Sequence, residues 1–203
     1  GIVSKLEELR DLGTRLRSVR GTDANRYTVS VDQMQRNALV IGKLYRGYEL
    51  SVTNATVAQT VALGSNRRVI SVDVEDTSAN ISASIEQLAK LGSDLGTIHL
   101  TDDQKVLSLS SVQYAGYQAV LGRIDARNIY TVTIGNASVQ QAQLLAGDSR
   151  VTDISVADGA ATISRALSVL QPIDKISTIT MTGRPQALQV SAAELGDATV
   201  LGK

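Results

Sequence analysis

The feature that most constrains the fold of this chain is a pattern that occurs twice at nearly constant spacing. The run R-V-I-S-V-D-V-E-D-T-S-A-N-I-S from Arg68 returns as R-V-T-D-I-S-V-A-D-G-A-A-T-I-S from Arg150, and 150 − 68 = 82. T-I-H-L-T from Thr97 returns as T-I-T-M-T from Thr178, and 178 − 97 = 81. Self-similarity at a fixed period is typical of repeat proteins, and the small drift falls where loops tolerate deletions.

The beginning of the chain fits the same period. L-E-E-L-R-D-L-G-T-R-L-R-S-V from Leu6 matches I-E-Q-L-A-K-L-G-S-D-L-G-T-I from Ile85, and 85 − 6 = 79. I-G-K-L from Ile41 matches L-G-R-I from Leu121, and 121 − 41 = 80. The period divides the chain into a partial repeat (1–44) and two full repeats (45–124 and 125–203). A natural polypeptide rarely begins within a repeat, so we expect a segment of a longer protein.

Local signals predict the order β-α-β-α-β-β-α for repeat 45–124. Alternating runs predict strands at 48–52, 69–74, 97–101 and 106–109, and apolar residues at helical spacing predict helices at 57–63, 78–91 and 112–122. Thr56, Asp76 or Thr77, and Ser110 or Ser111 are the candidate N-caps. Leu88 and its counterparts Leu9 and Leu170 are expected to be buried. The second full repeat follows the same order to Lys203, with Pro172 ending its long helix earlier.

The partial repeat gives similar signals. Ser4, with Glu7 three residues later, predicts a capped helix over 5–12. A short strand is expected at Val19 and a second one over 26–31. The apolar spacing that follows predicts one helix from Asp32 to Gly42.

Strands that alternate with helices favour parallel pairing through right-handed crossovers, so the predicted class is α/β. Tandem repeats of about 80 residues would then stack as a solenoid-like array. The alternative is a string of small α+β domains, because a unit of that size can fold alone. The continuous stack is favoured because no Pro-, Gly- or Ser-rich linker separates the copies.

The composition removes several classes of site. Phe, Trp and Cys are absent and Pro occurs twice, which leaves a core of small aliphatic side chains and excludes disulfides and thiolate metal sites. No apolar run reaches the length of a membrane span and no secretory signal is visible, so membrane insertion is not expected.

Charge is balanced overall but unevenly placed. Residues 1–47 hold nine Lys or Arg and five Asp or Glu, which leaves eleven against fifteen for the rest. We interpret Arg10, Arg15, Arg17 and Arg20 as a solvated helix face. The opposite charges of the two ends nevertheless predict weak head-to-tail self-association. Basic residues are not interleaved with aromatic ones, so no nucleic-acid partner is expected.

Candidate catalytic residues are few. His99 is the single histidine, and its counterparts are Arg20 and Thr180, so we interpret it as an exposed strand residue. No nucleophile elbow, phosphate loop or dinucleotide fingerprint is present. The sequence therefore predicts no catalytic site and no enzyme.

Acidic residues form the one metal candidate. Calcium prefers several carboxylates on loops, and the sequence offers Asp73, Glu75, Asp76, Asp102 and Asp103. The second repeat keeps fewer acids, because its corresponding stretches contain Asp153, Ala157, Asp158, Gly183 and Arg184. The glycine–aspartate nonapeptide of calcium-binding β-helices is also missing. We interpret the acids as caps and turn residues and expect no cofactor.

Two further motifs have structural interpretations. Glycosylation sequons begin at Asn54, Asn80 and Asn136, and a turn Asn followed by a Thr or Ser cap accounts for the first and third. Tyr114 and Tyr117 could form an adhesive patch, but packing beneath the next layer is the interpretation we prefer.

The runs V-x-V-x-D-T-S-A-N-I-x-x-x-I-x-x-L (72–88), T-I-x-L-T-D (97–102) and L-S-L-S (107–110) resemble tandem repeats of very large bacterial secreted and cell-surface proteins of the adhesin or RTX-associated type. The second repeat departs from the pattern, with D-G-A-A-T in place of D-T-S-A-N. The resemblance implies an extracellular structural or adhesive array without an active site.

Three functions follow as hypotheses. The leading one is a non-catalytic structural or adhesive segment of a bacterial surface protein, acting as a spacer or an interaction surface. The second is a self-assembling subunit of a filament, sheath or S-layer. The third, an enzyme or ligand-binding domain, would need a cluster of convergent polar residues that the sequence does not display.

Overall fold

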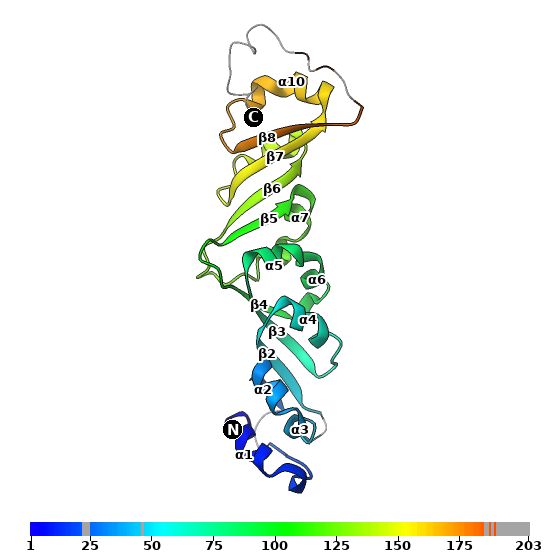
Figure 1. Ribbon diagram of the computed structural model, residues 1–203, viewed down its shortest axis with the longest axis vertical. Coiled ribbons are helices and arrows are strands. Elements are labelled where there is room, and N and C mark those ends of the chain that lie inside the picture. The colour runs from blue at the N-terminus through cyan, green and yellow to red at the C-terminus, as the bar shows by residue number, and fades with distance from the viewer. Residues whose placement is uncertain (22–24, 46, 185–186, 188, 190–203) are drawn as a thin grey trace. The chain divides into compact units, whose positions relative to one another are not determined.

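The computed structural model describes residues 1–21, 25–45, 47–184, 187 and 189, and within them it contains two four-stranded parallel sheets (Figure 1). The first sheet has the order β1-β2-β3-β4 and the second the order β5-β6-β7-β8. Neighbouring strands in each sheet are thus consecutive in sequence, joined by helical crossovers. The predicted α/β class with parallel strands is confirmed.

The strands are short, and β1, β2, β3, β5, β6 and β7 are each followed directly by a helix, whereas β4 is followed by β5. Their bounds are β1 Arg26–Ser30, β2 Glu49–Ala55, β3 Val69–Asp76, β4 Leu95–Leu100, β5 Val106–Ser110, β6 Thr131–Ala137, β7 Val151–Gly159 and β8 Ile176–Thr182.

The α-helices are α1 Leu6–Asp11, α2 Val31–Arg36, α3 Ala38–Ile41, α4 Val57–Leu63, α5 Ser78–Ala83, α6 Ile85–Ala89, α7 Ser111–Gly116, α8 Gln118–Leu121, α9 Val139–Leu145 and α10 Ala160–Leu170. Three 3₁₀ turns add η1 Val3–Lys5, η2 Gly13–Arg15 and η3 Gly92–Asp94.

Residues 45–124 contain the predicted element order, and the boundary between the sheets falls inside it. β4 and β5 follow one another in sequence but belong to different sheets. β1 pairs with β2 across residues 44 and 45, and β5 pairs with β6 across residues 124 and 125. Each sheet therefore takes strands from both sides of a predicted repeat boundary. The strand and helix predicted for 187–203 lie outside the described residues, except for 187 and 189.

Helices predicted as single elements are mostly pairs of shorter ones. The predicted helix 78–91 is divided into α5 and α6 at Ser84, and the helix 32–42 is divided into α2 and α3 at Asn37. Tyr117 divides α7 from α8 in the same way, with φ −112° and ψ 29°. The apolar spacing continues across these breaks because both halves face the same sheet, as the buried Ile81 and Ile85 show. In contrast α10 is continuous and ends at Leu170, before Pro172.

Two predictions for the partial repeat are wrong. Ser4 does not cap α1, because its hydroxyl donates to the Gly1 carbonyl, and α1 has no side-chain cap. Val19 forms only an isolated parallel bridge with Leu44 instead of a strand.

Within the described residues, four helices begin with the same capping box. In α2, α4, α7 and α9 a Ser or Thr side chain accepts the backbone N–H of a Gln three residues later, and that Gln side chain accepts the cap's own N–H. The pairs are Ser30–Gln33, Thr56–Gln59, Ser110–Gln113 and Ser138–Gln141. These boxes fix where each strand ends and its helix begins.

The two sheets share one irregularity. Ala55 pairs with Val74 after a register shift in the first sheet, and Ala137 pairs with Val156 after the same shift in the second. The residue before each alanine is an asparagine with positive φ, 59° at Asn54 and 54° at Asn136. Asparagine tolerates the left-handed conformation better than most residues, so it suits this bulge.

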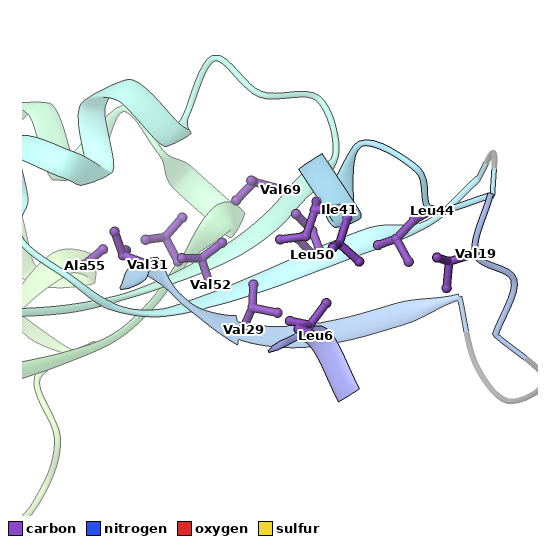
Figure 2. Close-up of a cluster of buried hydrophobic side chains, with 12 residues drawn as sticks. Leu6, Val19, Val29, Val31, Ile41, Leu44, Leu50, Val52, Ala55 and Val69 are labelled. Atoms are coloured by element: carbon purple, nitrogen blue, oxygen red, sulfur yellow. The ribbon is translucent and has the colours of Figure 1, made fainter. Parts of the chain in front are cut away.

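The core is aliphatic and lies between each sheet and its helices. Figure 2 shows the cluster around β1 and β2, where Val29, Leu50 and Val52 contact side chains of the first helices. Leu88 and Leu170 are buried at 1% and 2% exposure, as expected. Their counterpart Leu9 is only partly buried, so that part of the prediction is wrong.

Candidate functional site

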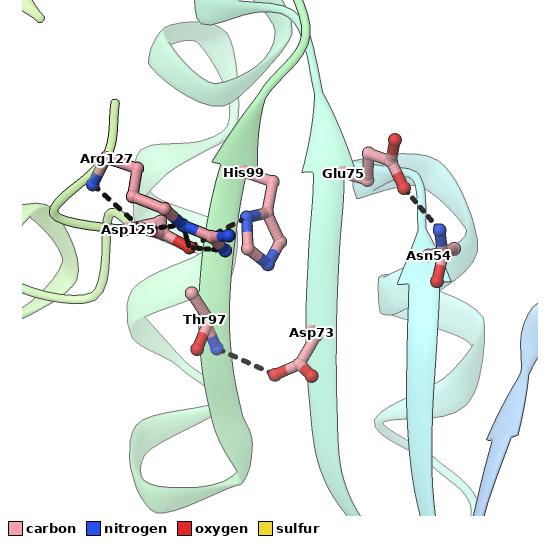
Figure 3. A network of polar contacts seen from close by, with 7 residues as sticks. All are labelled: Asn54, Asp73, Glu75, Thr97, His99, Asp125 and Arg127. Carbon is pink, nitrogen blue, oxygen red and sulfur yellow. Dashed lines mark hydrogen bonds and ion pairs between the residues drawn. The ribbon is translucent and has the colours of Figure 1, made fainter. Parts of the chain in front are cut away.

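The first sheet has one apolar face and one polar face. Side chains alternate along a strand, so Val72 and Val74 of β3 are buried towards the helices. Asp73 and Glu75, which alternate with them, lie on the opposite face. We call this helix-free side the open face of the sheet, and Thr97 and His99 of β4 extend it (Figure 3).

The open face of the first sheet contains a groove of about 600 Å³. It lies near the ends of β2, β3 and β4 and is closed on one side by the segment 125–128. Its lining consists of Thr53, Asn54, Asp73, Glu75, His99, Leu100, Asp125, Arg127 and Asn128. Donors and acceptors from four separate chain segments therefore converge there.

Backbone pairing places the segment 125–128 beside β4. The Ile98 N–H donates to the Arg123 carbonyl at 2.8 Å, and the Asp125 N–H donates to the Ile98 carbonyl at 2.9 Å. The Asn128 N–H then donates to the Asp125 carbonyl at 2.8 Å, which forms a turn. This wall of the groove is thus fixed to the sheet by main-chain hydrogen bonds.

Asp125 is the most interconnected side chain of the groove. Its carboxylate accepts hydrogen bonds from Arg127 Nη2 at 2.6 Å and Nε at 3.0 Å, and His99 Nδ1 lies 3.3 Å from it. The hydrogen bonds from Arg127 hold the pKa of Asp125 well below its usual range. Asp125 is 13% exposed whereas the Arg127 side chain is 84% exposed, so the guanidinium reaches solvent at the rim.

The other two carboxylates are also positioned by internal donors. Asp73 accepts the Thr97 N–H at 2.8 Å, and Glu75 accepts the side-chain amide of Asn54 (Figure 3). The Asp73 carboxylate lies directly over Gly96, where any Cβ would overlap it. Each of these hydrogen bonds uses one carboxylate oxygen, so both side chains are held in place as acceptors.

The acidic residues thus have two different roles. Asp76 and Asp102 accept N–H groups at helix starts: Asp76 accepts the Val57 N–H at the start of α4, whereas the predicted helix 78–91 is capped by Thr77, and Asp102 accepts the Ser78 N–H at the start of α5. Asp158 accepts the Val139 N–H at the start of α9 in the same way. The cap interpretation is wrong for Asp73 and Glu75, which belong to β3, accept hydrogen bonds from Thr97 and Asn54, and line the groove.

The other sequence candidates have structural roles. Thr56 and Ser138, the third residues of two sequons, cap α4 and α9, and the amide of Asn80 donates to Asp76. Tyr114 is buried and its hydroxyl donates to Asp148 at 2.6 Å, which agrees with packing rather than an adhesive patch. Burial and this hydrogen bond raise the pKa of Tyr114 to about 12.

Sequence reasoning placed His99 correctly on an exposed strand face, where its side chain is 38% exposed, but missed its neighbours. Asp125 and Arg127 follow α8 in the chain, and no motif links them to β4. The local D-x-R spacing is the only signal that could have suggested an ion pair. Nothing in the sequence marked the groove itself.

Comparisons with protein-family models, with curated proteins and with solved structures find no match to this chain. Over the described ranges, no three His, Cys, Asp or Glu side chains are grouped so that they could hold a metal ion. The helices of the described part of the chain all lack the length and apolar character that a membrane crossing requires.

Proposed function

We propose that this chain is a non-catalytic segment of a repeat array in a large bacterial extracellular or cell-surface protein, where it acts as a spacer and an interaction surface. The observation that carries the proposal is the match between sequence recurrence and local geometry. Residues related by the sequence period occupy the same strand register, the same asparagine bulge and the same capping box. This match supports tandem units of one design, which is how repeat arrays are built.

The contacts between successive layers support the spacer function. Within each sheet, strands that follow one another in sequence pair, and aspartates at or just after strand ends accept N–H groups from the preceding helix, as Asp76 and Asp102 do. Such nearest-neighbour contacts are how repeat arrays distribute stability along their length. An array of this kind extends by adding layers without a new core.

The open faces support the interaction function. In the second sheet the helix-free side presents hydroxyls that bond one another, Thr133 with Ser108 at 3.0 Å and Ser155 with Thr178 at 3.2 Å. In the first sheet it presents the groove described above. Strand alternation keeps these side chains out of the core, so they can vary without changing the fold.

A deletion of one whole period tests the proposal. Removing residues 68–149 takes out one period and joins Arg67 to Arg150, the counterpart of Arg68. We expect this protein to fold with a cooperative thermal transition and an unchanged ratio of helix to strand by circular dichroism. The control removes residues 109–149, half of that span, and should not fold. If both proteins are unfolded, the repeat-array proposal fails.

The second candidate function, self-assembly into a filament, sheath or S-layer, is favoured by one observation. Leu39 is 79% exposed and lines a hollow of about 280 Å³, whose other lining residues are Leu9, Gly13, Thr14, Leu16 and Val40 together with the basic Arg10 and Lys43. An apolar hollow with a basic rim suits head-to-tail association that weakens with salt. Electron microscopy should then show filaments or lattices, and sedimentation velocity should show association that rises with concentration and falls with salt. A concentration-independent monomer would remove this candidate.

A further inference from the structure

We propose that the groove on the open face of the first sheet is a binding site for a polyhydroxylated ligand, that is, a saccharide. The inference rests on the proposed function only in taking the open face as the interaction surface. It adds the position of the site and the chemistry of its ligand.

The groove offers acceptors and donors side by side. Asp73 and Glu75 supply carboxylate oxygens, whereas Arg127 and Asn128 supply N–H groups and His99 supplies a second ring nitrogen. A sugar hydroxyl both donates and accepts, so a site for several hydroxyls needs both kinds of partner within one small space. The volume of about 600 Å³ lies in the range of small-molecule sites, roughly 300–1,000 Å³.

Hydrogen bonds within the protein already hold the side chains of the groove in position. Asp73 is fixed by the Thr97 N–H, Glu75 by Asn54, and Asp125 by Arg127. Side chains that are already ordered lose little conformational entropy on binding, which is the main advantage of a preformed site. The Asn54 side chain that donates to Glu75 is itself carried by the bulge of β2, where its backbone has a φ of 59°.

The groove combines acidic and basic groups rather than acids alone. Asp125 is paired with Arg127, whose exposed guanidinium lies at the rim, and Asp73 and Glu75 each already use one carboxylate oxygen for an internal donor. The lining of the groove also includes Leu100 but no tyrosine, phenylalanine or tryptophan ring. Recognition would therefore come from hydrogen bonds to hydroxyl groups rather than from stacking.

The second sheet shows that the fold does not require this set of side chains. The counterparts of Thr53, Asp73, Glu75 and His99 are Gly135, Ser155, Ala157 and Thr180, at offsets of 82, 82, 82 and 81. β6, β7 and β8 pair normally with these residues present. The polar set is thus an addition to one copy of the scaffold, as expected for a site that serves a ligand.

The test is a titration of the isotope-labelled chain with the methyl glycosides of glucose, galactose, mannose and N-acetylglucosamine, followed by amide chemical shifts. We expect at least one glycoside to shift resonances of residues 53–54, 73–75, 97–99 and 125–128. The triple variant Asp73→Ser/Glu75→Ala/His99→Thr, which uses residues the second sheet already contains, should lose these shifts and keep the wild-type spectrum elsewhere. Asp153→Ser, on the open face of the second sheet, should bind as the wild type does.

If the triple variant is unfolded, Asn128→Ala takes its place, because Asn128 lines the groove while its backbone N–H, which the substitution keeps, forms the turn. The inference is wrong if no glycoside shifts the groove resonances, or if the shifts persist in the variants. It is also wrong if only agmatine, added as a cationic probe, binds. The protein lacking residues 68–149 separates the two proposals, since it should fold as an array and yet fail to bind.

Discussion

The two sheets have the same backbone plan but use different side chains to stabilise it. Asn66 in the first sheet and Asp148 in the second each accept an N–H two residues later, from Arg68 and Arg150. Asp148 additionally accepts the Tyr114 hydroxyl, whereas the residue at the Tyr114 position of the first sheet is Met34. The hydrogen bonds to the backbone N–H groups of Arg68 and Arg150 are thus common to both sheets. The hydrogen bond from Tyr114 of α7 to Asp148 is specific to the second sheet.

A second pair of equivalent positions leads to the same conclusion. The bridges Val19–Leu44 and Ile98–Ile124 have the same main-chain pattern. Beside the first, Arg20 lies over the ring of Tyr45 at 4.0 Å, and beside the second, His99 lies 3.3 Å from Asp125. Equivalent positions of the repeat therefore share their buried apolar residues and main-chain hydrogen bonds, whereas their exposed side chains differ.

The largest effect is expected from the buried leucines. Leu88→Ala and Leu170→Ala should each lower the free energy of unfolding by about 2–5 kcal/mol, the range for leucines whose removal leaves a cavity. Leu9→Ala should cost clearly less, because Leu9 is only partly buried. Urea unfolding of the three variants measures this order. Equal losses at all three positions would mean that the first repeat packs as tightly as the other two.

Loss of the Tyr114–Asp148 hydrogen bond should have the next largest effect on the free energy of unfolding. Tyr114→Phe removes a hydrogen bond to a carboxylate and should cost about 1–2 kcal/mol, whereas Met34→Leu, the matched change in the first sheet, should cost under about 1.5 kcal/mol with no pH dependence. The folded-state pKa of Tyr114 is raised from 10.0 to about 12. The stability that the protonated Tyr114 hydroxyl contributes is therefore fully present below the pKa of the unfolded state. This stability is lost as the pH rises through the pKa of the folded state.

Unfolding of the wild type and of Tyr114→Phe at neutral pH and across pH 10.0 to about 12 measures this loss. The difference between the two proteins should shrink as the pH rises. A difference that stays constant with pH would show that Tyr114 stabilises the chain by packing alone.

The N-caps of α5 and α10 differ, and changing them should alter the free energy of unfolding by a smaller amount. Thr77 caps α5 and accepts the Asn80 N–H, whereas α10 begins at Gly159 without a side-chain cap. Thr77→Ala should cost about 1 kcal/mol, and Gly159→Thr should gain a few tenths of a kcal/mol, roughly the difference between these caps. A Cβ at Gly159 would meet nothing within 4 Å. Thermal unfolding would contradict this comparison if Gly159→Thr lowered the midpoint.

The smallest effect is expected at His99. Replacement by Thr, the residue at the equivalent position 180, should change the free energy of unfolding by no more than about 0.5 kcal/mol, because Arg127 still binds Asp125. Arg20→Thr at the first bridge is the matched change. A loss well above that value at His99 would mean that its contact with Asp125 holds the segment 125–128 in place.

Features that depend on neighbouring residues could be predicted from the sequence. Thr56, Thr77 and Ser110 cap helices as expected, and the alternating run at 69–74 predicted the strand β3. The helix breaks at Ser84 and Asn37 could not be predicted, because the apolar spacing is the same on both sides. The groove could not be predicted either, because Asp73, His99 and Asp125 come from distant segments and exposed strand positions are polar in any sheet.

The pairing of strands in sequence order has a consequence for how the chain acquires its structure. In both sheets that the structure describes, the strands lie side by side in sequence order, so no later strand is inserted between two earlier ones. Within each sheet, a chain that emerges gradually from a ribosome can therefore add each strand to the one before it. Pairing between strands that are consecutive in sequence keeps the contacts of each sheet local, and a lower contact order favours faster folding.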